Sequence, residues 1–176
     1  MTPAHLIAAF AAALALTAAV SDVRQRRIPN ALTYPSMVVG LALQTVLYGR
    51  PGLLHSLAGG LSFGGVFLVF YLVRAMGAGD VKLAAALGFI VGLPESVTLM
   101  FATAVAGGVL AVAYMVRSGQ TKRTLGRTFS VVWHHVRHGL NAHPEVNLDN
   151  PQAVRMPYGL AFATGTLYWA LSSLWR

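Results

Sequence analysis

Apolar residues form long runs along the chain, and short polar stretches separate these runs. Six of the runs predict helices, at residues 3–20, 32–47, 53–73, 81–93, 96–116 and 157–175. A helix needs about 20 apolar residues to cross the hydrocarbon core of a bilayer, and most of these runs approach that length. The pattern therefore predicts an all-α polytopic membrane protein with six transmembrane helices, in a single domain over residues 1–176.

The fourth run is shorter than the others. A helix over residues 81–93 would cover about 20 Å, whereas the hydrocarbon core is about 30 Å thick. We expect the stretch just before this run, residues 76–79 (Met-Gly-Ala-Gly), to enter the membrane as non-helical backbone. Such backbone must face a cavity lined by protein, because lipid cannot pair its polar groups.

The basic residues fall mostly on one side of the predicted membrane. Six spans place residues 21–31, 74–80 and 117–156 on the same side, and with Lys82 these stretches hold 11 of the 13 Lys and Arg residues. The positive-inside rule makes this side cytoplasmic, so both termini are predicted to face outward. Topology thus explains most of the net charge of +8, and no nucleic-acid partner is expected.

Composition supports the membrane assignment. Hydrophobic residues make up 56% of the chain and charged residues only 10%, well below the roughly 25% of a soluble domain. A cleaved signal peptide is not predicted, because the basic cluster follows the first apolar run instead of preceding it. The absence of cysteine excludes a disulfide framework, a thiolate metal site and a cysteine nucleophile.

The loop 117–156 contains apolar residues at helical spacing. They predict a helix that lies on the cytoplasmic membrane surface, and they are Leu125, Phe129, Val132, Trp133, Val136 and Leu140. His134, His135, His138 and His143 lie along the same loop and allow a metal site as an alternative. Because no set of carboxylates or cysteines accompanies them, we predict neither a metal nor a cofactor.

The chain has only five carboxylates, and two of them stand out. Glu95 suits the first turn of a helix, while Glu145 and Asp149 lie in a polar linker where water would solvate them. Asp22 and Asp80, by contrast, both lie at the cytoplasmic ends of apolar spans. Carboxylates at a membrane boundary are costly and usually have a function.

Each of these two acids also has a structural explanation. Asp80 directly precedes the fourth span, where Asp is a favoured N-cap. Asp22 follows the end of the first span and could form a salt bridge with Arg24, Arg26 or Arg27.

Together the two acids suggest an aspartyl protease. Two neighbouring carboxylates share a proton, so that one can act as a general base on water while the other polarises the scissile carbonyl. The glycines of Gly77-Ala78-Gly79-Asp80 would let a peptide strand lie close to Asp80.

Three segments resemble the motifs of the type IV prepilin peptidases, which are intramembrane proteases with a Gly-x-Gly-Asp (GxGD) motif. Residues 22–30 begin with Asp, continue with a basic stretch and end in Ile-Pro-Asn, like the first motif of that family. Residues 77–83 contain Gly-x-Gly-Asp-x-Lys, like the second motif, and residues 155–159 are similar to the Pro-Tyr/Phe-Gly opening of the last span.

The resemblance implies an enzyme of the bacterial inner membrane that removes the leader peptide of type IV prepilins or pseudopilins at the cytoplasmic face. It implies Asp22 and Asp80 as the catalytic pair, Gly77 and Gly79 as residues of the active-site loop, and Lys82 as a further motif residue. The implied partners are a prepilin or pseudopilin with one apolar span and membrane lipid, and a homo-oligomer is left open.

Within the family, the compact chain resembles the peptidases of tight-adherence (Flp) pili. Long members of the family carry paired cysteines that are linked to methylation of the new pilin N-terminus. Since this chain has no cysteine, methyltransferase activity is not expected.

Five further residues have both structural and substrate-binding interpretations. Pro29 and Asn30 suit the break and the N-cap at the start of the second span, and Pro157 suits the first position of the last span. Tyr158 and Gly159 follow Pro157 in the third motif, and any of the five could contact substrate.

Two interpretations of other kinds stay open at this point. Lys82 could extend to lipid phosphates or tune the Asp pair. The whole chain could be a transporter or a pilus-assembly scaffold, in which Asp22 and Asp80 would be ion sites or helix caps. A transporter would place an acid nearer the bilayer midplane.

Overall fold

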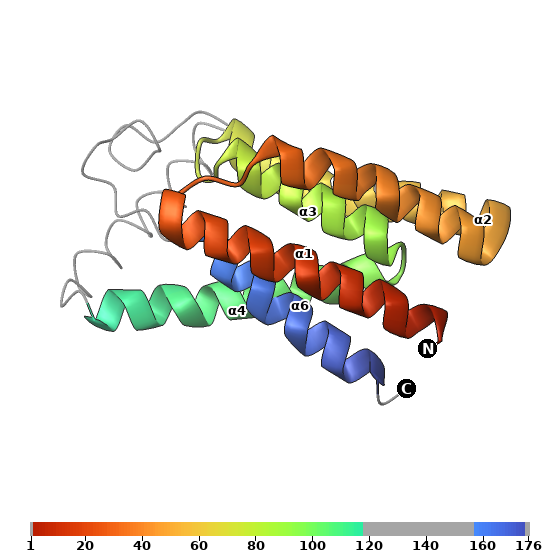
Figure 1. The fold of residues 1–176 in the computed structure, drawn as a ribbon. Helices are drawn as coiled ribbons and strands as arrows, with labels where there is room; N and C mark the ends of the chain where they lie inside the picture. Colours follow the sequence, from red (N-terminus) through yellow and green to blue (C-terminus); the bar gives the residue numbers. More distant parts are fainter. Residues whose placement is uncertain (1, 118–156, 175–176) are drawn as a thin grey trace.

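The computed structural model describes residues 2–117 and 157–174, and within these residues it contains helices and no strands. The helices are α1 (Pro3–Gln25), α2 (Asn30–Leu72), α3 (Ala78–Val91), α4 (Glu95–Arg117) and α6 (Gly159–Leu174) (Figure 1). The all-α prediction is confirmed for this part of the chain. Of these helices, α1, α2 and α4 are long and apolar enough to cross a membrane.

Two predicted spans, 32–47 and 53–73, lie within the single element α2. The element is broken at Gly49, whose φ of 64° falls in the left-handed region that glycine tolerates best. Both parts pack on α3, and they run in opposite directions along it. Gly40 of the first part faces Ile90, whereas along the second part Gly59 faces Gly88 and the later Gly64 faces the earlier Ala85.

Helix α3 begins earlier than predicted. Ala78 and Gly79 form part of its first turn, so only Met76 and Gly77 of the expected non-helical stretch precede the helix. The reason is local: Gly77 adopts the extended conformation of an N-cap residue, and the Asp80 carboxylate accepts a hydrogen bond from its N–H. That bond pairs a backbone donor at the start of the helix.

Helix α6 begins at Gly159, two residues later than the predicted span. Pro157 and Tyr158 precede it, and their carbonyl oxygens accept hydrogen bonds from the N–H groups of Leu160 and Phe162. These bonds form the entry turn of the helix, so Pro157 lies ahead of the helix instead of at its first position.

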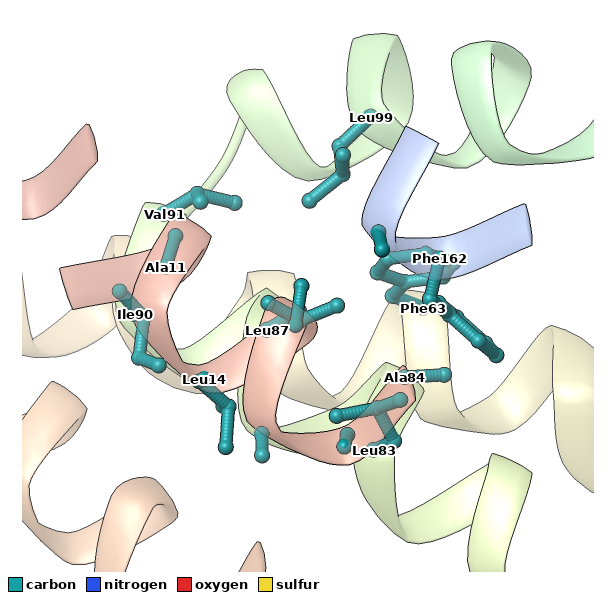
Figure 2. Close-up of a cluster of buried hydrophobic side chains, with 14 of the residues drawn as sticks. Ala11, Leu14, Phe63, Leu83, Ala84, Leu87, Ile90, Val91, Leu99 and Phe162 are labelled. Carbon is teal, nitrogen blue, oxygen red and sulfur yellow. The ribbon is translucent and has the colours of Figure 1, made fainter. Parts of the chain in front are cut away.

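The core is centred on α3. Its side chains Leu83, Leu87 and Ile90 are fully buried. Figure 2 shows them beside residues of the other helices, including Leu14 of α1 and Phe162 of α6. Because α3 is enclosed in this way, the position of its first turn, which carries Asp80, is fixed by packing on several sides.

Large apolar side chains also cover the outside of the helices. Val46 is 82% exposed, and Leu61 and Val105 are each more than half exposed. Contiguous exposed apolar surface marks contact with a partner or a membrane, and lipid suits helices of this composition. The six-span topology and its N-out/C-out orientation stay predictions, and the predicted surface helix within 117–156 lies outside the described residues.

Candidate active site

Asp22 belongs to the inward face of α1. The buried residues Ala11, Ala15 and Ala18 precede it at intervals of four, three and four residues, which is the spacing of one helix face. The side chain of Asp22 is 9% exposed. One turn later the helix ends at Arg26, which has a φ of 50° and donates its N–H to the Asp22 carbonyl oxygen at 2.7 Å.

The carboxylate of Asp22 binds the first residue of α6. The N–H of Gly159 donates to Oδ2 of Asp22 at 2.8 Å. A Cβ atom on Gly159 would lie 2.9 Å from the Cβ of Asp22 and 3.0 Å from the Cα of Ala19. Such distances are too short for real contacts, so the approach of α6 to this acid requires glycine at position 159.

The salt-bridge interpretation of Asp22 is wrong for the described residues. Arg24, Arg26 and Arg27 are exposed, and none of them pairs with the buried carboxylate, whose partner is the N–H of Gly159. The loop that carries these arginines is held instead by Ser21, whose hydroxyl donates to the carbonyl oxygen of Arg27 at 2.8 Å.

Asp80 lies at the third position of α3 and is not its N-cap. Gly77 is the N-cap, and its N–H donates to Oδ2 of Asp80 at 3.2 Å. A Cβ atom on Gly77 would lie 3.2 Å from the same oxygen, so a larger residue there would press on the carboxylate. Asp80 therefore stabilises the start of α3 and also places its carboxyl group at that end of the helix.

The two carboxyl groups lie within electrostatic reach of each other. Asp80 precedes the predicted span 81–93, at the boundary of the apolar region. Burial, followed by the charge of Asp22, raises the pKa of Asp80 to about 7, although the hydrogen bond from Gly77 acts in the opposite direction. A carboxyl group with this pKa binds and releases its proton near neutral pH.

The residues around the two acids also meet. Ile28, which follows Asp22 in the first motif, is 7% exposed, and a Cβ atom on Gly79 would lie 3.2 Å from its Cβ. Gly79 therefore lets the loop between α1 and α2 rest on the first turn of α3.

Lys82 forms a second link between the same elements. Its Nζ donates to Oδ1 of Asn30 at 2.9 Å and lies 5.2 Å from the centre of the Tyr34 ring. Asn30 is thus not the N-cap of α2: Pro29 holds that position, and the Asn30 side chain binds Lys82. These contacts make Lys82 a bridge between the start of α2 and α3.

The third motif reaches the site through two residues. Gly159 contacts Asp22, and the half-buried Tyr158 packs against the core within electrostatic reach of Asp80. Pro157 shapes the turn before α6 through its carbonyl oxygen. The other two residues of this motif, at positions 155 and 156, lie outside the described residues.

Two contacts of the site were not predicted individually. Ile28 is an apolar residue within the strongly polar stretch 24–30, so its burial could have been predicted from the sequence. The Gly159 contact is made by a backbone N–H, for which side-chain chemistry gives no signal.

The remaining acids give no metal site in the described part of the chain. There, no group of three or more His, Asp or Glu residues lies close enough to hold a metal ion. Glu95 has a structural contact, as interpreted from the sequence: it starts α4 and accepts a hydrogen bond from Nε1 of Trp169 in α6 at 2.7 Å. The four histidines of the loop 117–156 lie outside the described residues.

Comparison with known proteins identifies the family. The model of the type IV leader peptidase family matches residues 9–112, a region that contains Asp22 and Asp80. Searches of curated proteins and of solved structures gave no match. The matched region covers more than half of the chain and contains both acids of the site, so the chain belongs to the type IV leader peptidase family, a family of proteases.

Proposed function

We propose that the protein is an aspartyl endopeptidase that removes the leader peptide of type IV prepilins or pseudopilins at the cytoplasmic face of the bacterial inner membrane. The observation that carries this proposal is the electrostatic proximity of the buried Asp22 and the half-buried Asp80 at the boundary of the apolar region. Family membership supports a leader peptidase, and the acid pair supports the aspartyl type.

The chemistry needs one proton between the two carboxyl groups. The ionised carboxylate removes a proton from a water molecule, which then attacks the carbonyl carbon of the scissile bond. The protonated carboxyl donates a hydrogen bond to the carbonyl oxygen while negative charge develops on it. When the C–N bond breaks, the leaving amine takes the proton that the general base had removed from water, and the pair again holds one proton.

Backbone groups near the acids suit an extended peptide. Gly77 presents no side chain beside Asp80, so a substrate strand can approach the loop closely there, whereas the space beside Gly79 is taken by Ile28. The positive charge predicted for the cytoplasmic side does not attract a basic leader. We therefore propose that recognition rests on the apolar span of the substrate and on backbone contacts at this loop.

The test is a cleavage assay with purified protein in liposomes and a prepilin substrate. We expect wild type to release the leader, while Asp22→Asn and Asp80→Asn release none, because each removes half of the pair. Glu95→Gln is the matched control: it also exchanges an acid for its amide, but it lies at the contact between α4 and α6. Full activity in either Asp variant contradicts the mechanism, and no cleavage by folded wild type favours a transporter or a scaffold.

A further inference from the structure

The start of α6 touches one acid of the pair and not the other. The N–H of Gly159 lies 2.8 Å from Oδ2 of Asp22, whereas the corresponding contact of Asp80 is the 3.2 Å bond from Gly77 on its own helix. The first contact joins residues 137 positions apart in the chain. It therefore depends on how α6 packs against α1.

The contact has a chemical consequence for Asp22. Gly159 is the first residue of a helix of 16 residues, and the start of such a helix carries free N–H groups and a positive partial charge. A carboxylate that accepts a short hydrogen bond at this place is stabilised in its ionised form. Burial by itself disfavours a charged carboxylate, and the hydrogen bond from Gly159 opposes that cost at a place where little water competes for the Oδ2 atom.

Among the residues that the structure describes, none of the neighbouring cations pairs with the Asp22 carboxylate. Asp80 of α3 lies within electrostatic reach of Asp22, and Tyr158, which precedes α6, lies within electrostatic reach of Asp80. Lys82 is bound to Asn30, and the arginines at positions 24, 26 and 27 are exposed. In the described part of the chain, the backbone of Gly159 is thus the group placed to favour the charged form of Asp22.

We infer that Gly159 is a positioning residue of the active site: its N–H holds Asp22 as the ionised general base, which leaves Asp80 to hold the shared proton. This inference rests on the proposed function and adds the division of roles between the two acids. It also gives the third motif a task, since glycine at position 159 is required for the N–H to come close enough.

The sharpest test replaces the peptide bond between Tyr158 and Gly159 with an ester, which removes the N–H and changes little else. A hydrogen bond to a charged group is lost, so we expect kcat for leader cleavage to fall roughly tenfold to hundredfold. The carboxylate stretching band of Asp22 should also shift in infrared spectra of protein labelled with ¹³C-aspartate. Only three aspartates carry this label, and the band is assigned by its loss in Asp22→Asn.

A second pair of variants covers the case in which the ester protein does not fold. Gly159→Ala keeps the N–H but places a Cβ atom 2.9 Å from the Cβ of Asp22, so α6 must move away and the same band should shift. Gly108→Ala on α4 is the control, because a Cβ atom there meets nothing within 4 Å. We expect this control to leave both cleavage and the Asp22 band unchanged.

The outcomes separate this inference from the proposed function. An ester protein that cleaves like wild type, or that loses activity without any shift of the Asp22 band, overturns the inference and leaves the peptidase function standing. If wild type cleaves no prepilin, the function fails, while the infrared band still reports whether Gly159 binds Asp22. A protonated carboxyl band that persists at neutral pH in Asp80→Asn also overturns the assignment of roles.

Discussion

Gly59 of α2 is a residue at which one added carbon atom should force two helices apart. A Cβ atom there would lie 2.5 Å from the carbonyl oxygen of Gly88 and 2.8 Å from the carbonyl carbon of Gly92. All of these atoms belong to the backbone, so no flexible side chain can move aside. In Gly59→Ala, α2 and α3 must therefore separate.

The size of the effect follows from two opposing terms. Overpacking of a well-packed interior costs about 1–3 kcal/mol, while alanine stabilises a helix by about 0.5–1 kcal/mol relative to glycine. Gly65→Ala should show only the gain from alanine, because Gly65 lies on the same part of α2 and a Cβ atom there meets nothing within 4 Å. The difference in unfolding free energy between Gly59→Ala and Gly65→Ala should thus be about 1–3 kcal/mol.

Thermal unfolding in detergent measures this difference. For a chain of this size each kcal/mol corresponds to about 2–4 °C, so Gly59→Ala should melt roughly 2–12 °C below Gly65→Ala. Leader cleavage should fall as well, since α3 carries Asp80 and its displacement moves one acid of the pair. Equal melting temperatures for the two variants would show that the helices do not meet through these glycines.

Three further predictions concern other contacts. The pKa of Asp80 is raised from 3.8 to about 7, so between these pH values the folded protein retains a proton that the unfolded chain releases. The stability of wild type relative to Asp80→Asn should therefore be greatest below about pH 4 and fall as pH rises towards 7. Melting curves taken across this pH range measure the difference. A stability difference between the two proteins that does not change with pH would contradict the raised pKa of Asp80. In a double-mutant cycle, Lys82→Met and Asn30→Ala should show a coupling of up to about 1 kcal/mol, because their hydrogen bond is partly exposed; additive effects would show that the bond contributes nothing. Trp169→Phe should cost about 1–3 kcal/mol of stability by removing the donor to Glu95, while Glu95→Gln keeps an acceptor and should cost less; the reverse order in melting temperature refutes this explanation.

The sequence predicts the helices well because apolar runs determine where helices form in a membrane protein. It places the ends of helices less well. Helix α3 begins three residues earlier than the predicted span because the Asp80 carboxylate accepts a hydrogen bond from the N–H of Gly77. This polar contact stabilises a first turn that contains glycine and alanine. The break between the predicted spans 32–47 and 53–73 is confirmed, since Gly49 has non-helical backbone angles and separates two parts of α2.

The two acids of the site were predictable, but their surroundings were only partly so. Asp22 and Asp80 are conspicuous because acids are rare in this chain and both follow or precede apolar runs. The contact between Lys82 and Asn30 joins two quoted motifs, yet neither motif indicates which polar atoms meet. Distances between helices depend on packing, and packing cannot be read from a periodic pattern.

Small residues determine those distances, and this has a consequence for how the site is assembled. Ala19 and Gly159 let α6 approach α1 at Asp22, while Gly59 and Gly88 let α2 approach α3, which carries Asp80. Each acid belongs to one of these helices, so a shift of that helix relative to its neighbours moves the carboxyl group with it. Changes at these glycines should thus alter the separation of the acids without touching either carboxyl group. An enzyme whose two catalytic groups must share one proton tolerates little such movement, because proton transfer requires hydrogen-bond distances.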